Sequence, residues 1–201
     1  MAGLSLVDDG VVIDLSAMRA VRVDPEHHTA VAQGGATWAD FDHETQAFGL
    51  ATTGGLVSST GIAGFTLGGG IGWLSRKHGM QTNAVTAIEL VTADGEVRRI
   101  DHDNETDLFW AIRGGGGNFG VATRFRYRLH PVDQVVGGML FLPATTEVIA
   151  GLIAEFEAAP EELSGIVNVM VAPPMPFVPA EQHGKLLVMA MLVHVGDPEA
   201  G

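Results

Sequence analysis

The chain has 201 residues, of which 46% are hydrophobic, and a formal net charge of -13 at pH 7. This length and composition allow a substantial buried core and favour a globular protein of one domain or one and a half. The 11 lysines and arginines are too few and too scattered to neutralise a nucleic acid backbone, and there is no cysteine for a disulfide, a thiolate metal site or a nucleophile. The composition therefore excludes nucleic acid binding and thiol chemistry.

The start of the chain has neither a basic segment nor a long apolar core, so it lacks the pattern of a signal peptide. No apolar run reaches the length of about 18 residues that predicts a membrane-spanning helix. We therefore expect a cytoplasmic protein that does not contact a membrane.

Short β-branched runs separated by Asp, Gly and Pro open the chain and predict strands at 11–15, 20–24 and 29–34. An apolar stripe at helical spacing predicts a helix over 37–48, with Thr37 at its start and Gly49 after its end. The first part of the chain thus combines a small sheet with a packed helix.

Further along the chain, we expect a short helix at 71–78 and a hairpin of two strands, 84–93 and 96–100. The turn of this hairpin is Asp94-Gly95, which is the strongest short hairpin signal in the sequence. A second helix is predicted over 104–113, where Asn104 can act as the N-cap.

Strict alternation from 121 to 129 predicts a half-exposed strand. Three arginines occupy one of its faces, and the other face carries Val121, Thr123, Phe125, Tyr127 and Leu129. A second domain is expected from about residue 133. Its predicted elements are strands near 138–142, 166–171 and 186–193 and a helix over 145–158.

Two glycine-rich runs, 54–72 and 114–120, are the most informative feature of the sequence. Because glycine weakens regular elements by roughly 0.5–1 kcal/mol, such runs indicate close backbone approach or positive φ. We interpret them as two walls of one slot for a phosphate-bearing cofactor. Packing turns are the alternative, and Ser58, Ser59 and Thr60 favour the ligand because their hydroxyls satisfy many acceptors.

The second run fits the spacing G-x-G-x-x-G, but a predicted helix precedes it and a predicted strand follows it. A Rossmann dinucleotide site needs the opposite order, so we reject that interpretation. In the first run, Gly68 to Gly70 lead into the helix expected from Ile71, where free backbone N–H groups are available for an anion.

Other catalytic patterns are weak. None of the eight histidines pairs with a second ligand at metal-binding spacing, so no metal site is expected. The nucleophile elbow G-x-S-x-G is missing from the sequence, which disfavours a hydrolase.

A set of motifs resembles FAD-linked oxidases of the berberine-bridge-enzyme type, in the vanillyl-alcohol-oxidase (PCMH-type FAD-binding) family. The resemblance covers roughly residues 2 to 130. The motifs that carry it are VIDLSAM at 12–18, VDP at 23–25, GATWADFD at 35–42, SSTGIAGFTLGGGIGWLSRKHG at 58–79, LVTADG at 90–95 and DLFWAIRGGGGNFGVAT at 107–123.

The resemblance implies an α+β fold, with a PCMH-type FAD-binding domain at 1–132 that lacks its first subdomain. Residues 133–201 would begin an antiparallel-sheet substrate domain. It also implies an FAD-dependent oxidoreductase, an oxidase or dehydrogenase, that removes a hydride from a small alcohol, sugar or alkaloid to flavin N5. Its partners would be that small-molecule substrate and oxygen or another electron acceptor.

Carried over position by position, the resemblance predicts a cofactor site in two parts. The flavin ring and ribityl chain would be lined by Gly54, Gly55, Val57, Ser58, Ser59, Thr60, Gly61 and Gly64. The adenosine side would lie near Gly116, Asn118, Gly120 and Val121. Thr60 falls close to the position where relatives control oxygen access to the ring.

Departures from the family pattern predict that any FAD bound by this chain is non-covalent. The Arg-Gly-Gly-Gly-His type loop of relatives would precede Ala2-Gly3, Val57 stands where bicovalent relatives have cysteine, and Phe65 stands where the berberine subgroup has histidine. The family's catalytic base and its Asn-Tyr motif would lie beyond Gly201. No catalytic residue is therefore assigned.

Two hypotheses stay open from the sequence. In the first, the chain is a piece of a complete flavoenzyme. In the second, it is a non-catalytic remnant, or a half-domain that binds FAD weakly or only with a partner chain. A carbohydrate-binding β-module is weaker because it leaves both glycine runs without a purpose. An exposed sheet edge where the first subdomain would pack also predicts self-association.

Overall fold

A computed structural model describes residues 6–132, 134–176, 178 and 180–197. Contacts divide the chain into two compact units. The first unit holds the described residues of Met1–Gly72 and Met80–Pro131, and the second holds those of Trp73–Gly79 and Val132–Gly201. The assignment of 1–132 to cofactor binding and of 133–201 to a substrate domain stays a prediction.

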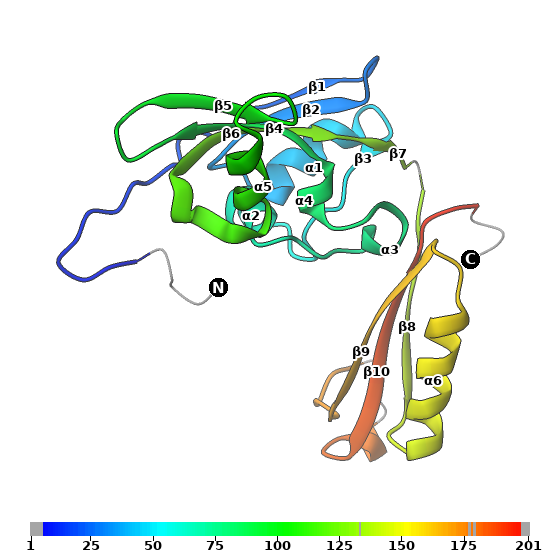
Figure 1. Cartoon of the computed structure of the whole chain (residues 1–201). Helices are drawn as coiled ribbons and strands as arrows, with labels where there is room; N and C mark the ends of the chain where they lie inside the picture. Colours follow the sequence, from blue (N-terminus) through cyan, green and yellow to red (C-terminus); the bar gives the residue numbers. More distant parts are fainter. Residues whose placement is uncertain (1–5, 133, 177, 179, 198–201) are drawn as a thin grey trace. The chain divides into compact units, whose positions relative to one another are not determined.

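The first unit is built on a five-stranded sheet in which every neighbouring pair is antiparallel. In spatial order its strands are β1 (Val21–Asp24), β2 (Thr29–Gln33), β6 (Val121–Arg128), β4 (Val85–Val91) and β5 (Val97–Asp101). One face is covered by α1 (Trp38–Gln46), α2 (Ile62–Leu67), α4 (Gln81–Ala84) and α5 (Thr106–Gly115), as Figure 1 shows. The short strands β3 (Leu50–Ala51) and β7 (His130–Pro131) form a separate pair.

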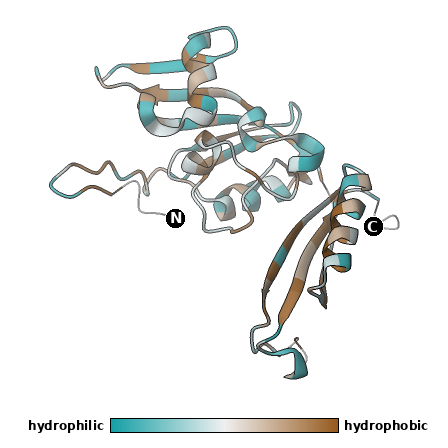
Figure 2. Cartoon of the chain, turned by 60° about the horizontal axis from the view of Figure 1, so that its bottom comes forward, coloured by the Kyte–Doolittle hydropathy of each residue, from teal (hydrophilic) through white to brown (hydrophobic). Residues whose placement is uncertain are grey.

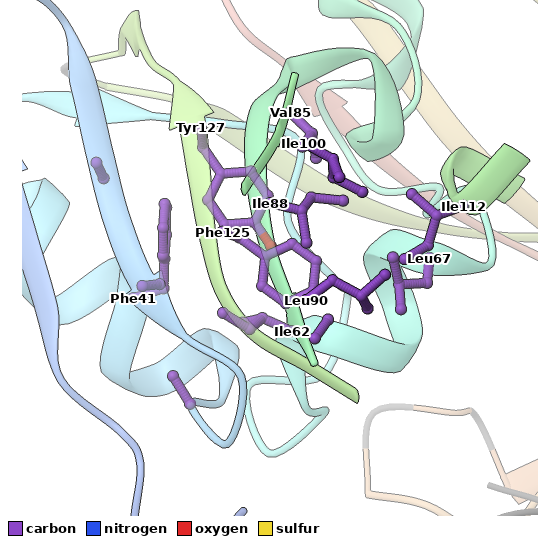
Figure 3. Packing of buried hydrophobic residues seen from close by; sticks show 14 of the residues in the cluster. Phe41, Ile62, Leu67, Val85, Ile88, Leu90, Ile100, Ile112, Phe125 and Tyr127 are labelled. Atoms are coloured by element: carbon purple, nitrogen blue, oxygen red, sulfur yellow. The ribbon is translucent and has the colours of Figure 1, made fainter. Parts of the chain in front are cut away.

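The core of this unit lies between the sheet and its helices (Figure 3). The small residues Ala30 and Ala32 on β2 leave room for large aromatic side chains, and Phe41 of α1 meets Tyr127 of β6 edge to face at 5.3 Å. The Tyr127 hydroxyl lies 2.9 Å from Thr66 Oγ1. Tyr127 is fully buried, so this hydrogen bond provides the partner that its hydroxyl cannot obtain from water. Burial raises the pKa of Tyr127 far above its ordinary value, so the hydroxyl stays protonated.

A β-bulge changes the predicted faces of β6. Leu90 pairs with Ala122 while Glu89 pairs with Arg124, so Thr123 is the extra residue. Ala122 is therefore buried, whereas Val121 and Thr123 are only partly buried, and their predicted place on the face of Phe125 was wrong. The predicted exposure of the strand's three arginines is confirmed.

Local rules located several boundaries correctly. Thr37 is the N-cap of α1 in a capping box with Asp40, and Gly95 has φ +81° in the hairpin turn between β4 and β5. The expected N-cap at Asn104 was wrong, because Glu105 at φ 53° precedes α5 and the Asn104 amide donates to the Arg99 carbonyl instead.

Two other expectations were also wrong. Residues 11–15 include the β-branched Val11, Val12 and Ile13 but form no strand, and the Val11 side chain is 90% exposed. The helix expected at 71–78 is only the single turn α3 (Ser75–His78). β-propensity alone forms no strand when no neighbouring strand accepts its hydrogen bonds.

The second unit contains a three-stranded antiparallel sheet with β10 (Leu186–His194) between β8 (Val136–Pro143) and β9 (Leu163–Val171). The helix α6 (Thr146–Ala158) begins at the N-cap Thr145, and η2 (Ala180–Gln182) lies in the loop before β10. These strands and the helix agree with the elements predicted after residue 133. Most of the sheet consists of hydrophobic residues, as the brown colour of its strands in Figure 2 shows. The Arg76 guanidinium of α3 donates to the carbonyls of Phe156 and Ala159, which fixes α3 against the end of α6.

Candidate cofactor site

The first glycine segment (residues 54–72) is held in place by the start of α1. The Trp38 N–H donates to the Thr60 carbonyl at 3.0 Å, and the Ala39 N–H donates to the Ser58 carbonyl at 2.8 Å. The first N–H groups of a helix lack partners within the helix, and this loop supplies them. The predicted site residues 58–61 are therefore positioned by backbone contacts with α1.

Two glycines of this segment are explained by the indole of Trp38. A Cβ on Gly54 would lie 3.3 Å from the ring, and a Cβ on Gly55 would lie 2.7 Å from its Cδ1 atom. Gly72 is required as well, because its Cβ would collide with the Gly54 carbonyl. At these positions, the need for glycine comes from the chain packing on itself.

The glycine triplet 68–70 ends a helix and does not begin one. The Gly68 N–H donates to the Gly64 carbonyl and the Gly69 N–H to the Thr66 carbonyl, both at 3.1 Å. Gly69 and Gly70 then take φ values of +110° and +73°, which stop α2. The predicted supply of free N–H groups before Ile71 was therefore wrong.

The second glycine segment (residues 114–120) forms the end of α5 and the turn η1 (Gly116–Phe119). The Asn118 side chain donates to the Gly115 carbonyl at 2.7 Å, which closes this turn. Gly120 has φ +145°, and a Cβ there would collide with the Val91 carbonyl of β4. Val121 follows as the first residue of β6, paired with Val91.

The structure brings the two segments together, because α2 packs against both α5 and η1. The two segments contain five glycines whose Cβ positions meet no atom within 4 Å: Gly61, Gly64, Gly114, Gly116 and Gly117. Gly64 sits inside a helix, where glycine costs about 1 kcal/mol relative to alanine, and no neighbour requires it there. These open glycines border space that a bound molecule can approach closely.

Buried polar atoms without partners gather along the first segment. Within the part of the chain that the structure describes, they include Trp38 Nε1, Gln81 Nε2 and Thr82 Oγ1. The Gln81 and Thr82 N–H groups donate to the Gly70 and Gly69 carbonyls, so these side chains start directly beside the segment. Unpaired buried polar atoms are rare in proteins and mark places where a ligand or water completes the structure.

Sequence reasoning missed Gln81 and Thr82. Their signal was the polar run Gln81-Thr82-Asn83 directly before the apolar strand β4. Gln81 is fully buried and its Oε1 accepts from Thr52 Oγ1 at 3.3 Å, which orients the amide. The Gln81 Nε2 group therefore keeps an unused hydrogen-bond donor beside the first segment.

The remaining predicted residues Val57, Ser58, Ser59 and Asn118 are exposed on the same unit. The Val57 side chain is 58% exposed. Among the described residues, no group of three or more His, Asp or Glu side chains is placed to hold a metal ion, and no helix is both long and apolar enough to cross a membrane.

The structure thus combines two glycine-rich segments, brought together by α2, with a five-stranded antiparallel sheet. The FAD binding domain family matches residues 1–101 of the chain, so the protein belongs to that family. The predicted family, its α+β fold and FAD as its cofactor are confirmed. The assignment of individual residues to the site stays a prediction.

Curated relatives include FAD-linked oxidoreductases. One from Aspergillus terreus is 48% identical over 132 residues, covering 66% of this chain and 27% of the relative. The (R)-6-hydroxynicotine oxidase of Paenarthrobacter nicotinovorans is 32% identical over 196 residues, covering 96% of this chain and 42% of the relative. The chain thus spans less than half the length of these proteins.

Solved structures show the same fold. The 6-hydroxy-D-nicotine oxidase of Arthrobacter nicotinovorans matches with a TM-score of 0.85 and 28% identity, over 98% of this chain and 43% of that one. A xylooligosaccharide oxidase of Myceliophthora thermophila matches with a TM-score of 0.76 and 27% identity, over 94% of this chain and 39% of that one.

Proposed function

We propose that the chain forms part of an FAD-dependent oxidoreductase that oxidises a small alcohol, sugar or alkaloid and passes the electrons to oxygen or another acceptor. The named relatives support this range, because they include an oxidase of a nicotine derivative and an oxidase of an oligosaccharide. FAD, when bound, supplies the hydride acceptor at N5 of its ring. The chain's own residues bind and orient the cofactor.

Two separate observations support this proposal: open glycines in both segments, and buried polar atoms without partners along the first segment. Gly61, Gly64 and Gly116 leave the backbone of both segments accessible, and Trp38 Nε1, Gln81 Nε2 and Thr82 Oγ1 lack partners beside the first segment. A flavin presents ring nitrogens and carbonyls that need such partners. The residues present therefore fit the cofactor.

We further propose that this chain holds FAD without a covalent bond. Val57 has an aliphatic side chain that forms no bond to a ring. Phe65 has no hydrogen-bonding atom, and its ring packs edge to face on Trp38 at a centroid distance of 5.2 Å. FAD held here depends on hydrogen bonds and packing alone.

Gly64 offers a sharp test because alanine there should affect stability and binding in opposite directions. Gly64→Ala places a methyl group in open space on a helix, so we expect the free energy of unfolding to rise by about 1 kcal/mol. The same methyl group would occupy space next to the cofactor, so the dissociation constant for FAD should rise at least about tenfold.

The matched control is Gly151→Ala in α6, where the Cβ also meets no atom within 4 Å. It should stabilise the chain by a similar amount and leave FAD affinity unchanged. Both quantities are measured by urea unfolding and by quenching of flavin fluorescence. If Gly64→Ala stabilises the chain and binds FAD as tightly as the original, the proposed site is wrong. If the unchanged chain shows no FAD binding, the half-domain hypothesis gains support.

A further inference from the structure

The outer face of the five-stranded sheet is the face opposite its helices (Figure 1). It carries an arginine-lined cavity. The register places Arg22, Val31, Arg126 and Ala87 side by side across four strands. The neighbouring row contains Arg124 opposite Glu89, which in turn lies opposite Arg99. A cavity of about 630 Å³ lies over this face. Val31 separates Arg22 from Arg126, and Ala87 lies on the other side of Arg126.

Two of the four arginines are free to bind a ligand. Arg124 pairs with Glu89 at 3.2 Å and Arg99 with Asp101 at 3.4 Å. For Arg22 and Arg126, by contrast, the described residues offer no ion pair or hydrogen bond to the guanidinium. Unpaired cations are unexpected in a chain whose net charge is -13, because acidic partners are abundant.

Three acidic side chains also line the cavity, and two of them already accept hydrogen bonds from other residues of the chain. The Asp24 carboxylate accepts from the His27 N–H, and its other oxygen lies 2.9 Å from His27 Nδ1. Glu89 accepts from Thr123 Oγ1 as well as from Arg124. Glu26 is the third. The unused cationic donors that line the cavity are therefore the guanidinium forks of Arg22 and Arg126.

The distance between the two guanidinium groups limits the size of a ligand that can contact both. Arg22 and Arg126 are separated by one strand, so their Cα atoms lie about 10 Å apart, and rows of the same face repeat every 7 Å or so along a strand. This footprint is far smaller than the roughly 800 Å² per partner of a stable protein interface. The cavity volume instead falls within the usual range of about 300–1,000 Å³ for small-molecule sites.

We propose that this cavity binds a small oligophosphate, with Arg22 and Arg126 each donating a pair of hydrogen bonds to phosphate oxygens. The guanidinium fork matches the geometry of phosphate and gives charge-assisted bonds, which suits a chain of phosphates reaching from one arginine to the other. Val31, which lies between the two arginines, is apolar and needs no hydrogen-bond partner, so the anion can lie over it.

The test is calorimetric titration of inorganic tripolyphosphate into the whole chain at physiological ionic strength, where the screening length is about 8 Å. We expect one site per chain, with Arg22→Ala and Arg126→Ala each weakening binding at least about tenfold. Arg128→Ala is the matched control: it lies on the same strand and face, is exposed, and does not line the cavity. It should change the affinity less than about twofold.

Two results would overturn the proposal. One is a lack of saturable heat with the unchanged chain. The other is a loss of affinity in Arg128→Ala equal to that in Arg22→Ala and Arg126→Ala. That result would show that the anion is attracted by the positive charge of the sheet face in general and has no defined site. All three arginines are exposed, so their replacement should leave the fold intact, and circular dichroism of each variant checks this.

Discussion

Two aspartates on α1 illustrate how neighbouring residues of one type take opposite roles. Asp40 accepts two hydrogen bonds from Arg19 Nη2 and one from Arg19 Nε, and this pairing lowers the pKa of its carboxyl to about 2. Asp42 is half-buried, and burial raises the pKa of its carboxyl to about 6. The folded structure therefore favours the ionised form of the Asp40 carboxyl and disfavours the ionised form of the Asp42 carboxyl.

Asp42 gives a prediction with a defined pH dependence. Because its carboxyl holds its proton more tightly in the folded state, the cost of ionising it appears as the pH rises above 3.8 and is complete above about 6. Asp42→Asn removes that cost, so it should raise the melting temperature near neutral pH and leave it unchanged near pH 3, well below both pKa values.

Glu44→Gln, at an exposed position of the same helix, is the control for this measurement. It removes the same charge from α1 and should raise the melting temperature less at neutral pH. If Asp42→Asn raises the melting temperature equally at both pH values, the added stability does not come from removing an ionised carboxyl.

The glycines fall into those that neighbouring atoms require and those with open space around them, and the sequence does not distinguish the two groups. Gly55, Gly72 and Gly120 are required because a Cβ there would collide with atoms of the same unit, and Gly54 is closely packed on Trp38, whereas Gly64 has open space. Gly120 is therefore a poor probe of cofactor binding, since its substitution would disturb the contact with β4. Knowing which neighbours approach each glycine requires the folded structure.

At the scale of elements, β9 is the most exposed apolar edge of the second unit. Its side chains Val167, Val169 and Val171 are exposed on one face, with Val169 at 52%. Beside them, Ile149, Ile153 and Phe156 of α6 complete a groove of about 500 Å³. An apolar edge strand offers unpaired backbone groups to another chain.

We predict that the isolated chain self-associates through β9. A lysine on the edge strand should oppose pairing, so Val169→Lys should shift the species seen by light scattering towards the monomer. Val97→Lys provides the control, because Val97 is 66% exposed on β5, the edge strand of the other sheet. A monomeric unchanged chain, or an equal effect of both lysines, would contradict this assignment.

Elements with strong local signals were predictable from the sequence. The capping box of α1, the Asp94-Gly95 hairpin and the alternation from Phe125 to Arg128 depend on nearby residues alone, and the structure contains all three. The bulge at Thr123 was not predictable, because it depends on how β6 meets β4. The helix α2 has two glycines at its borders and one inside, and it forms because Ile62, Thr66 and Leu67 are buried.

The candidate site was predictable only in outline. Motifs located both glycine segments, and packing of α2 on η1 brings them together. The unpaired atoms of Trp38, Gln81 and Thr82 became visible only in the folded chain, because burial and the loss of partners are properties of three-dimensional packing.

At the scale of the whole molecule, the two faces of the five-stranded sheet have different chemical character. The helix-covered face holds the apolar core and the glycine segments, and the outer face carries the exposed arginines of β1 and β6. The chain matches less than half the length of its curated relatives, so the activity of the whole protein is a proposal that extends beyond these residues.

Whether the two glycine segments hold FAD without a covalent bond is tested most directly by flavin content. The chain is dialysed to equilibrium with FAD, and the bound flavin is measured before and after acid precipitation. We predict about one FAD per chain before precipitation and all flavin in the supernatant afterwards. A chain that binds no flavin, or flavin that stays with the precipitated protein, would contradict the proposed site.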